Sequence, residues 1–335
     1  MTQQDNAVMV IAEIGSVHDG SLGNVLKLIE AAGEVGADAA KFQTHIAVEE
    51  TIRDAPTPAY FSAEDRFSYF DRTGFSPREW QLIKQHCDDN AVEFMSSPFS
   101  EAAVDLLESL SMQHYKIPSG EVTNLPMLEK IAAISKPVIL SSGMSNWVEL
   151  DEAVNVFSRK NCPLTVLQCS SRYPCPSDAV GLNVMQEMAR RYNCAVGLSD
   201  HTHSAAASIA AVTLGATVIE KHFTFSRLMY GSDAKHSMEP EEFRSMVGLI
   251  REVESMSANP VDKSDVSHYV DMKFIFQKSL VASHDLEAGT TLQRCDIGVK
   301  KPGSGLAPKN LELVLGRKLK CSLRMDALLA LNDFE

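Results

Sequence analysis

The chain has 335 residues, of which 44% are apolar and 22% charged, and it carries a net charge of −13. The acidic balance argues against nucleic acid as a partner, because phosphate binding needs a basic field, and no apolar stretch is long enough to cross a membrane. The seven cysteines are odd in number and form no C-x-x-C pair, which argues against a disulfide framework and a thiolate zinc site. The first residues lack signal-peptide features, and together these observations predict a cytoplasmic protein.

Eight short apolar runs alternate with helix-sized amphipathic stretches, and each run ends in polar or charged residues. The runs are residues 7–15, 39–45, 92–99, 114–120, 137–143, 164–171, 195–201 and 216–223. Eight buried parallel strands separated by helices predict an α/β fold of the closed (β/α)8 or TIM-barrel type. Catalytic groups of such barrels lie at the carboxyl ends of the strands, so we expect the polar endings to form one active site.

Helix start signals stand between these runs. Ser21 and Ser100 precede helical patterns, and residues 76–79 (SPRE) form a capping box with proline at the first helical position. Further helices are predicted at residues 125–134, 147–157, 183–192, 204–214 and 240–256. Residues 46–75 are too many for a plain loop, and we expect this insertion to cover the site.

The character of the sequence changes after Met256. A polar stretch is followed by short alternating runs that are broken by glycine and proline, which is typical of a small β-rich domain. We therefore predict a catalytic barrel at residues 1–257, a linker at 258–275 and a small domain at 276–335.

Two histidines end neighbouring predicted strands, and each lies beside an acid. His201 follows Asp200, and His222 lies near Glu220. Two imidazoles with carboxylate support and open coordination positions suit a divalent metal such as Mn²⁺, Zn²⁺ or Fe²⁺ acting as a Lewis acid. The alternative is a pair of hydrogen-bonded histidines in a polar layer.

Lysines and serines also gather at the predicted strand ends. They are Lys41, Lys116, Ser97, Ser119, Ser141 and Ser199. A ring of cations and hydroxyls suits a phosphate together with a carboxylate, and phosphoenolpyruvate carries both; the alternative is solvated lysines. Glu13 ends the first run, where a carboxylate can hold a sugar hydroxyl or steer a proton, or instead form an ion pair with Lys41.

Seven blocks in order resemble the N-acetylneuraminate (sialic acid) synthase family. They are residues 11–15 (IAEIG), 41–44 (KFQT), 116–121 (KIPSGE), 140–144 (LSSGM), 167–174 (LQCSSRYP), 197–201 (GLSDH) and 219–223 (IEKHF). Residues 300–305 (KKPGSG) resemble the C-terminal antifreeze-like (SAF, β-clip) domain of that family.

The resemblance implies a metal-dependent condensation of phosphoenolpyruvate with an open-chain N-acetylated aminosugar such as N-acetylmannosamine, which yields a nine-carbon 2-keto acid and phosphate. The implied metal is Mn²⁺, with Mg²⁺ or Co²⁺ as alternatives, and the implied assembly is a domain-swapped homodimer. The resemblance assigns His201 and His222 as metal ligands, and Glu220 and Asp233 as partners of metal-bound water or sugar hydroxyls. It also implies that Tyr173 and Gln43 border the sugar. The residues that it assigns to the phosphoenolpyruvate site are Lys41, Ser97, Lys116, Ser119, Ser141, Ser171 and Ser199.

Several positions depart from the family pattern, among them Ser97 and Ser171, which replace a threonine and an asparagine found in some members. Val17 stands where the family usually has asparagine, and Lys301 stands where an arginine of the partner subunit reaches the substrate's N-acyl group. Because lysine lacks the guanidinium fork, a second acceptor class stays open, namely a 6-deoxy diacetamido sugar leading to legionaminic or pseudaminic acid.

Two rival functions remain. A Schiff-base aldolase would use Lys116 with a lowered pKa and no metal. A non-catalytic protein would use the terminal module to bind carbohydrate or ice.

Overall fold

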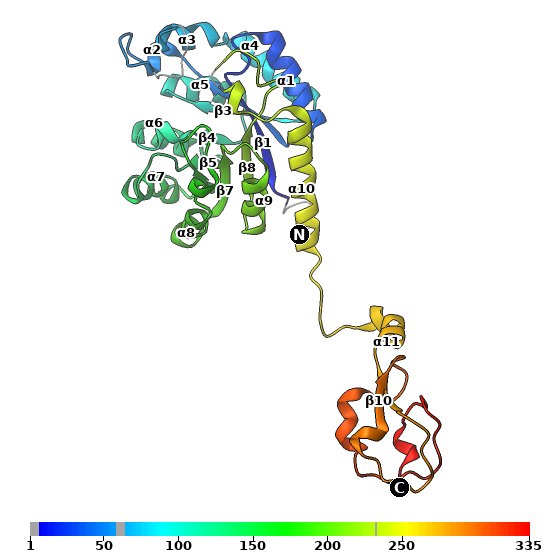
Figure 1. Ribbon diagram of the computed structural model, residues 1–335. Helices are drawn as coiled ribbons and strands as arrows, with labels where there is room; N and C mark the ends of the chain where they lie inside the picture. The colour runs from blue at the N-terminus through cyan, green and yellow to red at the C-terminus, as the bar shows by residue number, and fades with distance from the viewer. Residues whose placement is uncertain (1–6, 58–63, 232) are drawn as a thin grey trace. The chain divides into compact units, whose positions relative to one another are not determined.

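The barrel predicted from the sequence is confirmed. Within residues 7–57, 64–231 and 233–335, which the computed structural model describes, eight parallel strands pair in chain order and close on themselves (Figure 1). The strands are β1 (Met9–Gly15), β2 (Ala39–Thr44), β3 (Glu93–Pro98), β4 (Tyr115–Ile117), β5 (Val138–Ser141), β6 (Leu164–Cys169), β7 (Ala195–Asp200) and β8 (Val218–His222). Each strand lies within one of the predicted runs.

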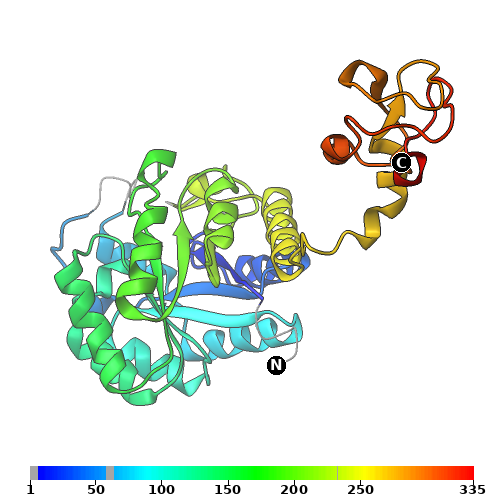
Figure 2. The ribbon, with the colours of Figure 1, turned by 90° about the horizontal axis from the view of Figure 1, so that it is seen from below.

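Helices surround the strands, as Figures 1 and 2 show. They are α1 (Leu22–Glu34), α2 (Ala47–Glu50), α3 (Arg66–Thr73), α4 (Pro77–Asp89), α5 (Glu101–Ser109), α6 (Leu125–Ile134), α7 (Trp147–Arg159), α8 (Leu182–Tyr192), α9 (Ala206–Thr213) and α10 (Pro240–Ala258). The predicted caps are present: Ser21 accepts from the Asn24 amide, and Ser76 and Glu79 form the capping box of α4. No helix of the described residues is both long and apolar enough to span a membrane.

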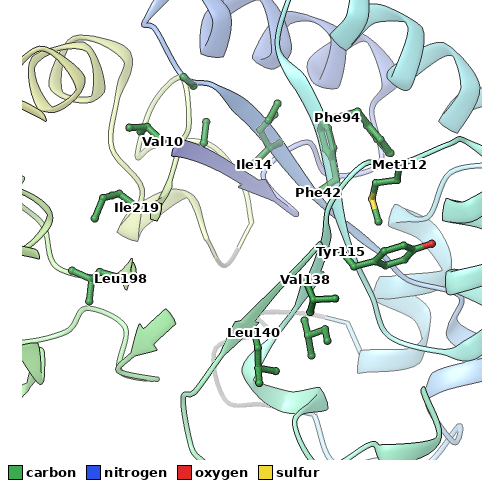
Figure 3. Packing of buried hydrophobic residues seen from close by; sticks show 14 of the residues in the cluster. Val10, Ile14, Phe42, Phe94, Met112, Tyr115, Val138, Leu140, Leu198 and Ile219 are labelled. Carbon is green, nitrogen blue, oxygen red and sulfur yellow. The ribbon is translucent and has the colours of Figure 1, made fainter. Parts of the chain in front are cut away.

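Alternate residues of each strand face opposite sides of the barrel wall. Outward side chains such as Val10, Ile14 and Phe42 pack in the large core that also contains the buried helix residues (Figure 3). A separate cluster fills the inside of the barrel and is called here the apolar floor. The floor consists of Ile11, Ala39, Met95, Ile139, Leu167 and Val218.

Polar side chains begin two residues beyond the floor on each of several strands. Glu13 follows Ile11, Lys41 follows Ala39, and Glu220 follows Val218. Because a strand repeats every two residues, these polar groups face the same interior as the floor, nearer the carboxyl ends. The fold therefore places the polar ending of each run inside the mouth of the barrel.

The insertion after β2 contains α2 and α3, and its residues 58–63 lie outside the described ones. Ala47, Phe67, Tyr69 and Phe70 form a small apolar cluster of their own within it. This cluster gives the insertion a core, so α3 presents fixed side chains.

Contacts divide the chain at residue 260, and the second unit covers Pro260–Glu335. It contains α11 (Val270–Phe276) and the antiparallel strands β9 (Ser279–Ala282) and β10 (Ile297–Lys300), with Leu280, Leu292 and Phe334 in its core. Most of the other short β-like runs predicted for this unit form only isolated β-bridges, because turns interrupt them. The stretch expected as a linker, residues 258–275, contains most of α11.

Candidate active site

A cavity of about 510 Å³ lies among the carboxyl ends of the barrel strands and the loops that follow them. The predicted site residues that line it are Glu13, Lys41, Gln43, Ser97, Lys116, Ser119, Ser141, Ser171, Tyr173, Ser199, His201, Glu220, His222 and Asp233. Lys301 is the exception: it belongs to the second unit, where its ammonium lies 5.0 Å from the centre of the Phe276 ring.

Strand register explains why residues far apart in the sequence meet here. Glu13 of β1 lies beside Lys41 of β2 on one side and beside His222 of β8 on the other. Ser199 of β7 likewise pairs with Glu220 of β8. Neighbours in register on parallel strands face the same side, so each pair points into the barrel together.

Two buried ammonium groups lie on either side of one carboxylate. Glu220 Oε2 is 3.6 Å from Lys41 Nζ and 3.4 Å from Lys116 Nζ, while Glu220 Oε1 accepts from Ser199 Oγ at 2.9 Å. Burial would raise the pKa of Glu220, but Lys116 and Lys41 outweigh it and lower this pKa to about 2. The carboxylate is therefore ionised at neutral pH.

The two lysines differ in their surroundings. Burial acts to lower the pKa of Lys41, but the negative charges of Glu13 and Glu220 together outweigh burial, and the net result is a raised pKa. For Lys116 burial dominates and lowers the pKa. Lys116 Nζ donates to Ser141 Oγ at 2.7 Å, and Lys41 Nζ donates to Ser97 Oγ at 3.3 Å, so serine hydroxyls hold both ammonium groups at the cavity wall.

Glu13 forms the ion pair that the sequence left open as an alternative. Its Oε2 lies 2.7 Å from Lys41 Nζ, and its Oε1 accepts from Gln43 Nε2 at 2.9 Å. Burial is the main cause that raises the pKa of Glu13. The same carboxylate lines the cavity, so pairing with lysine does not remove it from the site.

The two histidines lie together in the cavity wall, with ring centres 5.5 Å apart. His201 Nδ1 faces the Ser170 carbonyl oxygen at 2.9 Å, which fixes the proton on Nδ1 and leaves the Nε2 lone pair for a metal. Burial lowers the pKa of His222 to about 4, so this ring is neutral at pH 7. The Tyr173 ring lies tilted against the His201 ring, with ring centres 4.1 Å apart.

These donors fit a divalent cation that takes two imidazoles and fills its other positions with water or substrate oxygens. His222 Nδ1 is buried and has no hydrogen-bond partner among the described residues. An orphaned imidazole nitrogen beside a second imidazole is what a metal ligand without its metal presents. No cluster of three or more His, Cys, Asp or Glu side chains suited to a metal occurs in the described ranges.

Asp200 does not support His201, contrary to the sequence interpretation. Asp200 lies 2.9 Å from Lys221 Nζ and accepts from Ser208 Oγ at 2.7 Å. Neighbouring residues of a strand face opposite sides, so Asp200 and Lys221 point towards the helices while His201 points inward.

Asp233 enters the site from the loop after β8. Its Oδ2 accepts from the amide and the hydroxyl of Ser16, at 3.2 and 3.0 Å. A β-carbon at Gly15 would lie only 2.6 Å from that oxygen, and one at Gly143 would lie 2.3 Å from Ser171 Oγ. These glycines keep space for the polar groups of the cavity.

Several lining residues were missed by the sequence analysis. Arg66, Tyr69 and Phe70 come from the insertion, and Cys169 comes from the end of β6. Cys169 could have been found, because it stands two residues beyond the floor residue Leu167. Nothing in the sequence says which side chains of an insertion turn towards a site.

Comparisons with known proteins agree with this architecture. The NeuB family model matches residues 28–262, and the SAF domain model matches residues 277–335. The N,N'-diacetyllegionaminic acid synthase of Campylobacter jejuni subsp. jejuni serotype O:2 is 36% identical over 329 residues, which cover 96% of this chain and 98% of that protein. Pseudaminic acid synthase of the same strain is 32% identical over 337 residues, which cover 99% and 98%.

A solved structure shows the same arrangement of elements. The N-acetylneuraminic acid (sialic acid) synthetase of Leptospira borgpetersenii serovar Hardjo-bovis, in complex with citrate, superposes with a TM-score of 0.71 at 27% identity. The match covers 82% of this chain and 95% of that one.

Proposed function

The chain belongs to the NeuB family, as the sequence resemblance predicted, and on that premise we propose that it condenses phosphoenolpyruvate with an open-chain N-acetylated aminosugar. The products are a nonulosonic acid and phosphate. The observation that carries this proposal is the meeting of Lys41, Lys116 and a ring of hydroxyls with two imidazoles in one cavity.

The lysines and serines supply the anion site. Each ammonium donates to a serine hydroxyl and also faces carboxylate oxygens of Glu13 or Glu220, so an incoming phosphate or carboxylate would share these cations with the two glutamates. Two buried cations also lower the cost of bringing a multiply charged anion into a poorly solvated cavity. Ser119 and Ser171 add hydroxyl groups around the same space, and the Ser199 hydroxyl, which donates to Glu220, also lines it.

The reaction forms one carbon–carbon bond and one carbon–oxygen bond, the latter from water, and breaks the carbon–oxygen bond to phosphate. C3 of phosphoenolpyruvate attacks the sugar aldehyde, water adds at the resulting cationic C2, and phosphate leaves. Lys41 and Lys116 stabilise the negative charge of the phosphate and carboxylate in both steps. Glu13, held by Lys41 and Gln43, orients the sugar or the attacking water.

His201 and His222 would hold a divalent cation, with Mn²⁺ as our first choice and Mg²⁺ or Co²⁺ as alternatives. When bound, such a cation supplies Lewis-acid polarisation of the aldehyde oxygen. Glu220 and Asp233 would then hold metal-bound water or sugar hydroxyls, and Tyr173 and Gln43 would border the sugar.

A second question is which sugar is accepted. Two relatives, 36% and 33% identical, are N,N'-diacetyllegionaminic acid synthases, and Lys301 replaces the arginine expected for acyl recognition. Phe70, Phe99 and Met144 give the cavity apolar wall on which a 6-deoxy methyl group can pack. We therefore expect a diacetamido 6-deoxy sugar to be accepted better than N-acetylmannosamine.

The test is phosphate release from phosphoenolpyruvate in the presence of Mn²⁺ and one sugar at a time. N-acetylmannosamine and the two diacetamido sugars form the panel. We expect release only with a matching sugar and its loss on chelation. If no sugar gives phosphate release, the synthase function is rejected. Activity that survives the chelator, together with a covalent adduct that borohydride traps when pyruvate is present, would instead support the Schiff-base aldolase.

We also propose a homodimer, with domain swapping as the family resemblance implies, and a cytoplasmic location, because phosphoenolpyruvate is a cytoplasmic metabolite. Apolar side chains exposed on α11 support the dimer. Val270, Met272, Phe274, Ile275 and Phe276 are between 54% and 63% exposed, which is unusual for so many in one short helix.

A further inference from the structure

A buried line of polar side chains continues from Gln43 away from the cavity. Gln43 Oε1 lies 3.1 Å from His45 Nε2, and His45 Nδ1 lies 2.8 and 3.1 Å from the two carboxylate oxygens of Glu50. The side chains of His45 and Glu50 are only 7% and 4% exposed, and neither residue lines the cavity. An ion pair outside the cavity is thus linked to the Glu13 carboxylate inside it.

Two aromatic rings hold the His45 imidazole in its plane. The centre of the Phe70 ring lies 3.8 Å from the centre of the His45 ring, with 20° between the ring planes. The centre of the Phe99 ring lies 4.1 Å from that of His45, with 21° between the planes. Phe70 comes from α3 in the insertion, and Phe99 follows β3. Because rings from two separate segments pack on it, the imidazole cannot turn to new partners without moving both.

The hydrogen-bond partners determine what His45 donates. The Glu50 carboxylate oxygens face His45 Nδ1. Gln43 uses its amide nitrogen on Glu13, which leaves the amide oxygen facing His45, and because this oxygen only accepts, His45 Nε2 donates to it.

This arrangement fixes the orientation of the Gln43 amide. Without a donor at His45, the amide could turn over and point its oxygen at Glu13, where two acceptors would repel each other. Glu13 is held at both oxygens, because Gln43 Nε2 donates to Oε1 and Lys41 Nζ lies 2.7 Å from Oε2. The direction of the Gln43 amide thus decides how the Oε1 side of the carboxylate is held.

We propose that His45, held by Glu50 and stacked on Phe70 and Phe99, is a positioning residue that locks the Gln43 amide and through it the Glu13 carboxylate. The inference rests on the proposed function, in which Glu13 orients the sugar or water. His45 touches neither substrate, so its effect passes through Gln43 alone.

A double-mutant cycle tests this path. His45→Phe keeps an aromatic ring between Phe70 and Phe99 but removes the Nε2 donor, and we expect kcat to fall about 10- to 100-fold, as for other residues that orient a ligand from behind. The KM for phosphoenolpyruvate should change less than kcat, because the lysines are untouched. In a Gln43→Ala background, His45→Phe should cause no further loss.

Controls separate positioning from damage to the fold. His86→Phe removes a histidine that pairs with Glu30 at 3.2 Å and does not line the cavity, and it should leave kcat unchanged. Glu50→Gln keeps an acceptor oxygen for His45 and should give a smaller loss of kcat in the same direction. If His45→Phe does not fold, Glu50→Gln takes its place in the cycle with Gln43→Ala. An equal loss in the wild-type and Gln43→Ala backgrounds would overturn the proposal.

A spectroscopic measurement is independent of activity. Nitrogen NMR of the full chain should show a protonated Nε2 for His45, assigned by comparison with Glu50→Gln and His45→Phe. An unprotonated Nε2 would also overturn the proposal. If no sugar releases phosphate, the proposed function fails, while this spectrum still reports on the hydrogen-bond line itself.

Discussion

Glu220 couples the two buried lysines before any substrate arrives. Its carboxylate stays ionised because the two ammonium groups outweigh its burial. An incoming anion therefore meets lysines that already share one negative charge, and it must offer more favourable contacts than Glu220 alone. A phosphate and a carboxylate on one small molecule can contact both lysines at once.

Removing one of these cations should weaken anion binding. Lys116→Met keeps much of the side-chain volume but removes a charge-assisted hydrogen bond, which is worth about 1.5–3 kcal/mol. We expect the affinity for phosphoenolpyruvate to fall about 10- to 100-fold, measured by calorimetry and by KM. Lys136→Met, which removes an exposed partner of Glu108, is the matched control. Unchanged affinity in Lys116→Met would contradict the anion site.

His18 should make the barrel less stable in mild acid. Burial lowers the pKa of His18 to about 4, below the value of 6.5 for the unfolded chain. As the pH falls through 6.5 the unfolded chain binds the proton first, so the free energy of unfolding falls, by about 2 kcal/mol between pH 7 and 5. Above 6.5 this contribution is fully present.

The measurement is urea unfolding at pH 7, 6 and 5, followed by the fluorescence of Trp80 and Trp147, which both lie in the barrel unit. His18→Gln lacks the titrating group, so its stability should depend less on pH by that amount. Parallel pH curves for the two proteins would show that His18 is protonated as easily in the fold as in the unfolded chain.

Between strands, the buried pair of Asp200 on β7 and Lys221 on β8 joins the barrel wall to the loop after β7. The side chains are 0% and 1% exposed, and Lys221 Nζ also donates to the carbonyl oxygens of Thr202 and Ser204. The loop that follows His201 is thereby tied to the strand that carries His222. A strand pair thus holds both imidazoles from the helix side.

Breaking this pair should cost more than replacing it. Lys221→Met leaves the Asp200 charge buried without its partner, and we expect a loss of about 3–5 kcal/mol in the free energy of unfolding. The double variant Asp200→Leu/Lys221→Met should recover most of that loss in chemical denaturation. A double variant no more stable than Lys221→Met would show that the loop contacts, rather than the charges, carry the stability.

The strands and most of the site could be predicted because both follow from the alternation of strand side chains between the two faces of the barrel wall. Runs such as residues 39–45 are apolar on both faces until Lys41 and Gln43, so their polar inward positions could be identified from the sequence. Applied to Asp200, the same rule would have placed it opposite His201 and prevented the wrong assignment. Arg66 and Tyr69 could not be found, because the path of an insertion depends on tertiary packing.

For the molecule as a whole, the sequence distinguished the barrel from the tail but not the detail of the tail. Its short runs are β-like, yet regular pairing is limited to β9 and β10 among the described residues. α11 was missed because seven residues give too little periodicity to predict a helix, and its apolar side chains are not buried within the second unit. Local patterns alone cannot show what covers an exposed helix.

Those exposed side chains lead to a prediction about assembly. The full chain should elute at twice the mass of one chain in light scattering, and the double variant Phe274→Glu/Ile275→Glu should elute as a monomer, because charges oppose burial of that helix. Leu313→Glu, at a residue of the tail that is 56% exposed, is the control and should stay dimeric. A monomeric wild type would remove the dimer from the proposal.

The apolar floor and the polar mouth are made by different positions of the same strands. Much of the cavity wall where we expect the acceptor sugar comes from loops. Substitutions around Tyr173 or Lys235 reshape the cavity without touching Ile11 or Met95. Laboratory evolution towards a new sugar can therefore begin in the loops and leave thermal tolerance intact. Lineages that make different acids can diverge along the same route while their anion site is preserved.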